Sequence, residues 1–331
     1  MSEIVKASGY DKILLDLIPK LDNYTSISGA DGTAYFIDDR FVVKKITRSR
    51  TRKLFDEIFE YYFEEMKSYA EKGYSVPKFY AWAKFENENH GSDIFSMPYD
   101  YYILEERLPG RQLYLSNKIV DLYNCFESVC SEEDFKKVLL SPAKYKSLIK
   151  EVVQIYVKDF IDVNTRIEAM SDADLEKFVF SIYKMYEEGK YNVPDVYTTN
   201  VLLSEKNKLG IIDNFCIDKE RGFYSEKGDT AQEFVTVMML ELLTANVYMK
   251  ENYHVKWERE QSNSDLERLI RENEKINEAV IVKIFNIMKK RSGKISIEKK
   301  YVYDSICDLL ADYIGKERVA DFMQENGIQL S

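Results

Sequence analysis

Histidine, cysteine and basic segments are scarce in this sequence, and each scarcity excludes a class of function. Two histidines, His90 and His254, disfavour a histidine-based zinc site and a Ser-His-Asp triad. The four cysteines have no metal-binding spacing, and a 331-residue chain with so few is not a disulfide-framework domain. A reducing cytoplasm is therefore the expected location, although secretion by a route without a signal peptide would leave the same composition.

Long apolar runs and a positively charged surface are also missing. The net charge of −10 and the absence of a basic stripe speak against nucleic acid as a partner. The N-terminus has no signal-peptide apolar core, and no run is long enough for a membrane span. The most apolar stretch, 235–249, contains Glu241 and suits a buried helix. A hydrophobic content of 45% in 331 residues predicts a folded chain large enough for two lobes.

The most informative pattern that is present joins an aspartate, an asparagine and a second aspartate. Asp195 is followed by Asn200, a short apolar strand, a turn, a second apolar strand and Asp213. This order suits phosphoryl transfer, in which one carboxylate orients and deprotonates a hydroxyl while a carboxamide and another carboxylate hold Mg²⁺. For this segment alone, an aspartate turn with Asn200 capping a strand is the structural alternative.

A glycine turn and a lysine-bearing strand lie near the N-terminus. Gly29 and Gly32 belong to a predicted strand–turn–strand segment, where glycine lets a backbone approach phosphates closely. The next predicted strand alternates so that Val42 and Lys44 face the same side. Lys45 is the competing lysine, and the order Val-Val-Lys favours Lys44.

An amphipathic helix is predicted over residues 51–72. Apolar residues at helical spacing predict one buried face, which consists of Leu54, Ile58, Tyr61, Tyr62 and Met66. Its carboxylates include Glu57, Glu60 and, one turn later, Glu64. The apolar strand 101–104 and the segment 105–113 come next.

These features, in this order, resemble the protein-kinase-like superfamily over about residues 25–245. The likeness is to aminoglycoside phosphotransferases and choline-kinase-type enzymes and, less closely, to bacterial protein kinases. It implies an α+β, two-lobed protein-kinase-like fold. A small antiparallel-sheet N-lobe would occupy 1–104, and a large, mainly helical C-lobe would occupy 105–331.

The resemblance also implies roles for the acidic residues and the lysine. Asp195 would be the catalytic base, and Asn200 and Asp213 would be the Mg²⁺ ligands. Lys44 would pair with the α- and β-phosphates of ATP, and Glu60 would hold Lys44 in place, with Glu64 as the alternative.

Nucleotide binding would further involve the glycine turn and the connection between the lobes. Gly29 and Gly32 resemble a shortened glycine-rich loop that contacts phosphates. The connection resembles a hinge whose backbone groups meet the adenine edge, which places the adenine beside Leu104, Glu105 and Glu106.

Two positions depart from the superfamily pattern. A histidine usually precedes the catalytic aspartate by two residues, but Val193 stands there, so Tyr191, Asn192 or a backbone group must support the loop. The metal loop, Asp213 to Phe215, has no glycine in third place. Because the lysine and both aspartates are retained, an active enzyme is expected.

The remaining segments are predicted to be mainly helical. Residues 1–23 form a lead-in helix with Ile13, Leu14, Leu17 and Ile18 on one face. Ser171 to Asp174 form a capping box that starts a core helix ending at Gly189. A helical insertion at about 117–170 and a helical tail at about 250–331 have no generic assignment.

The phosphate acceptor is less well specified than the chemistry. The short segment after Asp213 lacks an Ala-Pro-Glu sequence, which favours a small-molecule hydroxyl acceptor such as an aminoglycoside, choline or a sugar. The segments starting at Asp229 and Leu240 resemble a protein-kinase core helix and keep a protein serine/threonine kinase, including a bacterial effector, as an alternative. A nucleotide-binding pseudokinase scaffold is the third reading.

Overall fold

In the computed structural model of this chain, the residues described are 9–29, 32–48, 52–87, 96–113, 133, 137, 158–159, 161–194, 196, 200–216, 230–244, 278–290 and 293–330. The chain divides into two units. The first comprises 1–109, 180–195 and 210–223, and the second comprises 110–179, 196–209 and 224–331. The predicted division at residue 104 stays a prediction.

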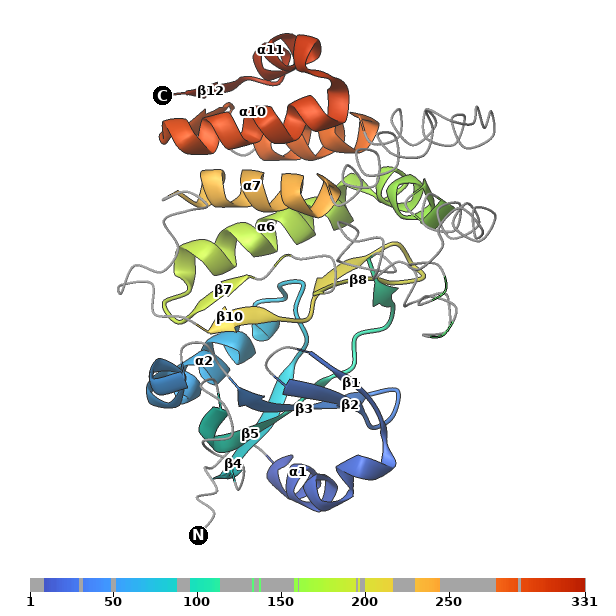
Figure 1. The fold of residues 1–331 in the computed structure, drawn as a ribbon, viewed down its shortest axis with the longest axis vertical. Coiled ribbons are helices and arrows are strands. Elements are labelled where there is room, and N and C mark those ends of the chain that lie inside the picture. Colours follow the sequence, from blue (N-terminus) through green and yellow to red (C-terminus); the bar gives the residue numbers. More distant parts are fainter. Residues whose placement is uncertain are drawn as a thin grey trace. The chain divides into compact units, whose positions relative to one another are not determined.

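A five-stranded antiparallel sheet forms the centre of the first unit (Figure 1). Its strand order is β1-β2-β3-β5-β4, so the last strand in sequence lies between β3 and β4. The strands are β1 (Thr25–Ser28), β2 (Gly32–Phe36), β3 (Phe41–Arg48), β4 (Phe79–Glu86) and β5 (Ser96–Glu106). Aromatic and β-branched residues are frequent in the three central strands, as expected for a sheet with two covered faces.

Different helices cover the two faces of this sheet. Helix α1 (Asp11–Leu17) and the 3₁₀ helix η1 (Ile18–Asn23) supply Leu14 and Leu21 to a core that includes Val43 and Leu104. Helix α2 (Arg52–Glu71) covers the opposite face, where the ring of Phe59 lies 4.3 Å from that of Tyr101 and 5.1 Å from that of Trp82. The predicted bounds of α2, 51–72, are confirmed to within one residue at each end.

Two apolar residues that were expected in helix faces are exposed instead. Ile13 is 38% exposed, because α1 has only seven residues and turns Leu14 rather than Ile13 toward the sheet. Tyr61 is 60% exposed, since it lies beyond the edge of the buried stripe of α2 and stacks on Tyr191 at 5.2 Å between ring centroids.

Helix α6 (Asp172–Glu188) begins at the predicted capping box. The backbone N–H of Asp174 donates to Ser171 Oγ at 3.1 Å, and this hydroxyl donates to the Asp174 carboxylate at 2.8 Å. The helix ends at Gly189, where an added Cβ would lie 2.6 Å from the carbonyl oxygens of Met185 and Asn192. Short strands β7 (Asn192–Pro194) and β10 (Asn214–Cys216) then pair antiparallel in the first unit.

The second unit is mainly helical in its described part. Its helices include α7 (Ala231–Thr244), α10 (Lys300–Ile314), α11 (Lys316–Glu325) and the helical residues 161–168 and 278–290. Its strands include β6 (Arg111–Gln112), β8 (Val201–Leu203), β11 (Ile295–Ile297) and β12 (Ile328–Leu330), while β9 (Leu209–Ile211) completes the order β6-β8-β9. Strands β11 and β12 pair in parallel.

The α+β class, with an antiparallel sheet followed by a largely helical remainder, is confirmed. In α7, residues 233–240 and Leu242 are buried, which agrees with the buried helix predicted for the described part of the apolar stretch. In the described part of the chain, no helix is both long and apolar enough to cross a membrane. The helical insertion at 117–170 lies outside the described residues apart from 133, 137, 158–159 and 161–170.

A close approach of β2 to β3 requires glycine at position 32. An added Cβ at Gly32 would overlap the carbonyl of Lys45 and lie 2.9 Å from Ile46 Cα. We expect Gly32→Ala to lower the free energy of unfolding by about 2 kcal/mol, because the two strands must separate. Thermal unfolding measures the effect. Gly29→Ala is the matched control, since its nearest neighbour would be 3.9 Å away, and an equal loss in both variants would contradict this account.

Candidate functional site

Lys44 lies near the centre of the sheet, on the face that α2 covers. Its ammonium Nζ is 3.3 Å from Glu105 Oε1 on β5, and it donates a hydrogen bond to the carbonyl of Ile212. Burial disfavours the charged ammonium, but the carboxylates of Glu105 and Asp213 outweigh this and raise the Lys44 pKa above its ordinary value. Lys44 is therefore a fixed positive charge beside the loop that carries Asp213.

Lys45, the competing lysine, faces the opposite side of the sheet. Its ammonium forms an ion pair with Asp100 at 2.8 Å and lies 5.5 Å from the centre of the Tyr102 ring. Strand alternation separates it from the loop before Asp213. Lys44, and not Lys45, therefore contacts the segment before Asp213, while a contact of either lysine with a nucleotide stays a prediction.

The carboxylate partner of Lys44 is Glu105 and not the expected Glu60. Glu60 is exposed on α2, and Glu64 is exposed with its carboxylate 3.8 Å from Lys67. The aromatic residues of α2 that are buried against the sheet fix the rotation of the helix about its own axis. In this rotation both glutamates lie on the outer side of the helix. The pairing of Lys44 with an α2 carboxylate is corrected accordingly.

Glu105 is a buried charged residue near the end of β5, an inner strand of the sheet. Its side chain is 4% exposed, and its Oε2 has no hydrogen-bond partner within the described part of the chain. Burial raises the pKa of Glu105 to about 7, and the nearby ammonium of Lys44 limits the rise. Sequence reasoning gave this residue only a backbone role, although its spacing from Tyr101 and Ile103 placed it on their face of the strand.

The glycine turn and the hinge are described, but their nucleotide contacts stay predictions. The backbone N–H of Gly29 donates to the carbonyl of Gly32 at 2.8 Å and closes the β1–β2 turn. Leu104 is buried in the core beneath α1. The N–H groups of Glu106 and Arg107 donate to carbonyls on neighbouring segments, each at 2.8 Å, so a base would need other backbone groups of this segment.

Strands β7 and β10 bring together the chain segments that precede and follow the two aspartates. Pro194, directly before Asp195, is the register partner of Asn214, directly after Asp213. Asp213 is exposed, while Asp195 itself lies outside the described residues. Asn200 is partly buried and precedes β8 in the second unit.

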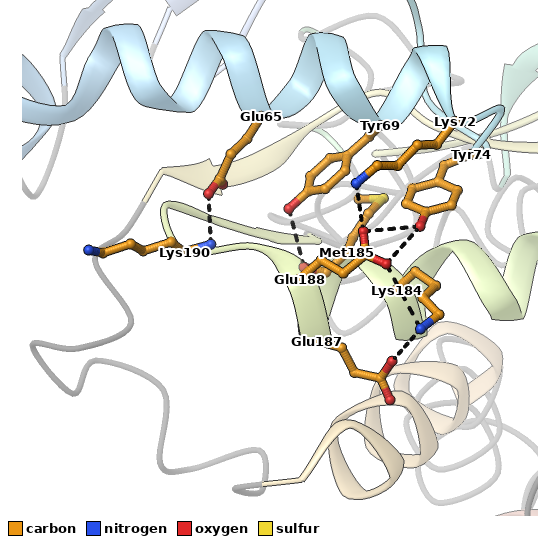
Figure 2. Close-up of polar contacts among 9 residues, drawn as sticks. All are labelled: Glu65, Tyr69, Lys72, Tyr74, Lys184, Met185, Glu187, Glu188 and Lys190. Carbon is orange, nitrogen blue, oxygen red and sulfur yellow. Dashed lines mark hydrogen bonds and ion pairs between the residues drawn. The ribbon is translucent and has the colours of Figure 1, made fainter.

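A carboxylate of α2 holds the start of β7. Glu65 accepts a hydrogen bond from the backbone N–H of Lys190 at 2.8 Å (Figure 2). It accepts another from the backbone N–H of Tyr191 at 3.0 Å. It also accepts from Asn192 Nδ2 at 2.8 Å, and this amide donates to the carbonyl of Tyr62 at 3.2 Å. Asn192 and two backbone groups are thus anchored to α2 just before Val193, and their support of the loop at Asp195 stays a prediction. The sequence pointed to these candidates but not to Glu65.

Further polar contacts join α2 and its following turn to the end of α6 (Figure 2). The Tyr69 hydroxyl donates to the carbonyl of Met185 at 3.4 Å, and Lys72 pairs with Glu188 at 2.8 Å. The Lys72 hydrogen bond lowers the pKa of Glu188 despite slight burial, while burial and the charge of Glu65 raise the pKa of the Tyr69 hydroxyl. Helix α2 therefore contacts both sides of the turn at Gly189.

No three histidine, cysteine, aspartate or glutamate side chains gather as a metal cluster within the residues that the structure describes. The predicted ligands, Asn200 and Asp213, offer a carboxamide and an exposed carboxylate. Such oxygen donors are the type that Mg²⁺ prefers, and Mg²⁺ usually keeps waters in its remaining positions. The donor chemistry thus fits Mg²⁺.

The contacts of Glu65 give a prediction for stability. Glu65→Gln retains one acceptor oxygen where the carboxylate serves three donors, so we expect a loss of about 1–3 kcal/mol in the free energy of unfolding. Thermal or denaturant unfolding measures it. Glu64→Gln, on the exposed side of the same helix, is the control and should change stability little. Equal effects of the two substitutions would show that the Glu65 contacts do not stabilise the fold.

No protein-family model and no curated protein matches this sequence. Among solved structures, it is similar to an aminoglycoside phosphotransferase from Alicyclobacillus acidocaldarius, at 11% identity and TM-score 0.27, covering 80% of this chain and 92% of that one. The chain is also similar to APH(2″)-IIa in a ternary complex with streptomycin and ATP, at 14% identity and TM-score 0.26. That alignment covers 94% of this chain and 100% of APH(2″)-IIa. A third similar structure is spectinomycin phosphotransferase APH(9)-Ia in complex with ADP and spectinomycin, at 12% identity and TM-score 0.23. That alignment covers 85% of this chain and 99% of APH(9)-Ia. At these values the functional assignment depends on the residues and contacts of this chain.

Proposed function

We propose that this chain is an ATP-dependent phosphotransferase of the protein-kinase-like type that transfers the γ-phosphate to a hydroxyl of a small molecule. The observation that carries the proposal is the contact of Lys44 with the loop before Asp213, next to the paired strands β7 and β10. A fixed cation and a metal-binding carboxylate are the two charges that a bound nucleoside triphosphate requires. The order of the sequence motifs supports the same chemistry.

Each residue then has a defined task. Asp195 accepts the proton of the acceptor hydroxyl, and Lys44 neutralises charge on the α- and β-phosphates. Asn200 and Asp213 are the residues that would hold Mg²⁺, which supplies further charge neutralisation when bound. Positioning and electrostatics provide most of the acceleration, so the transfer is direct and forms no covalent enzyme intermediate.

A small-molecule acceptor is favoured by the sequence after Asp213. That segment carries no Ala-Pro-Glu sequence of the kind used to dock a protein substrate. The acidic charge of the chain, −10 in total, would attract a cationic acceptor such as an aminoglycoside or choline.

Asp195→Ala should separate catalysis from binding. Loss of the proton acceptor is expected to lower turnover by about a hundredfold or more, while ATP binding is largely retained. Steady-state kinetics and calorimetric ATP binding on the same protein check both parts. Unchanged turnover would remove Asp195 from the catalytic role.

Asp213→Ala should have a different signature. Because the carboxylate is a proposed metal ligand, we expect ATP affinity to fall when Mg²⁺ is present and to change little without Mg²⁺. Titration of ATP at several Mg²⁺ concentrations measures this dependence. Normal affinity for Mg-ATP in the variant would show that Asp213 is not a ligand.

The reaction itself is tested by ATP consumption with aminoglycosides, choline, sugars and general protein substrates, with Asp195→Ala as the blank. Stimulation by one small acceptor supports the proposal. Phosphorylation of a protein, or of the chain itself, would indicate a protein kinase. Nucleotide binding without turnover would indicate a regulatory scaffold.

A further inference from the structure

Lys44 and Glu105 form an ion pair within a single sheet. In the β3–β5 register Val42 is opposite Glu105 and Lys44 is opposite Ile103. Cross-strand partners share a face, and so do residues two apart in a strand, so both charged side chains project from the same face. The pair is thus diagonal across two hydrogen-bonded strands, with 3.3 Å between Lys44 Nζ and Glu105 Oε1.

The carboxylates expected for Lys44 have other positions. Glu60 is exposed, and Glu64 lies 3.8 Å from Lys67. Glu65 faces inward on α2 but accepts hydrogen bonds from residues 190–192. The carboxylate that forms the ion pair with Lys44, Glu105, comes from the sheet.

We propose that Glu105 is the positioning residue of Lys44, holding its ammonium where the nucleotide phosphates bind. The inference rests on the proposed function, because it assigns a role in nucleotide binding. Glu105 does not touch the phosphates in this account and acts through Lys44.

The donor count of the ammonium supports this role. A lysine ammonium has three N–H donors, and among the described residues Glu105 and the carbonyl of Ile212 are the two acceptors. In the proposed complex, a phosphate oxygen accepts from the third N–H. Because the Glu105 side chain is only 4% exposed, water competes little for its carboxylate, and the direction of the ammonium is well defined.

The alternative is that Glu105 only shapes the pocket for the adenine base. A comparison of ATP with adenosine separates the two roles, because adenosine has no phosphates. We expect Glu105→Gln to weaken ATP binding about tenfold, the loss of a charge-assisted contact, and to leave adenosine binding unchanged. Isothermal titration calorimetry with both ligands and Mg²⁺ measures this. Glu105→Asp, which restores the charge on a shorter side chain, should recover part of the affinity for ATP. Glu86→Gln, at an exposed position of β4 in the same sheet, is the control and should bind ATP as the wild type does.

A second variant separates positioning from packing. In a Lys44→Gln background, Glu105→Gln should cause no further loss of ATP affinity, because the residue it acts through is gone. Should Glu105→Gln fail to fold, Glu105→Met replaces the buried carboxylate with an apolar side chain of similar size and should show the same selective loss for ATP.

Three results would overturn the inference. Unchanged or tighter ATP binding by Glu105→Gln would show that Lys44 needs no positioning by this carboxylate. Equal losses for ATP and adenosine would assign Glu105 to the shape of the base pocket. If the wild-type chain does not bind ATP, the proposed function itself is overturned. The titration of the wild-type chain alone distinguishes this result from the other two.

Discussion

The aromatic contact between α2 and the sheet determines where the charged side chains of that helix point. Phe55 and Phe59 pack on Tyr101, and Phe63 packs on Phe79. Burying one such side chain contributes about 1.5–3 kcal/mol, whereas an exposed ion pair contributes about 0–1 kcal/mol. The aromatic residues of α2 therefore determine how the helix is rotated about its own axis. This rotation in turn determines the directions in which its carboxylates point.

This order of energies explains which parts of the site could be predicted from the sequence. The helical period located α2 to within one residue at each end, and the strand period placed Lys44 on the same face of β3 as Val42. Which carboxylate meets Lys44 depends instead on the β3–β5 register, a pairing between strands separated by α2 and β4. No local pattern encodes such a long-range register, so Glu105 was assigned a backbone role only.

The contacts at the start of β7 could also be predicted only in part from the sequence. The missing histidine before Asp195 was visible in the sequence, and Asn192 was among the candidates to replace it. Its partner Glu65 could not be identified, because that contact joins residues 127 positions apart. The Asn192 side chain is buried, and its Oδ1 has no hydrogen-bond partner in the described structure. The network around this amide therefore tolerates little displacement.

The location of the Lys44–Glu105 pair also affects how such a site can be controlled. In protein kinases, the position of the helix that carries the lysine's glutamate partner switches the site on or off. Here the two charges belong to adjacent strands, so a shift of α2 would leave the ion pair in place. The same shift would instead displace residues 190–192 through Glu65. A displacement of this helix would thus alter the alignment of the strand leading to Asp195 and leave the Lys44–Glu105 ion pair intact.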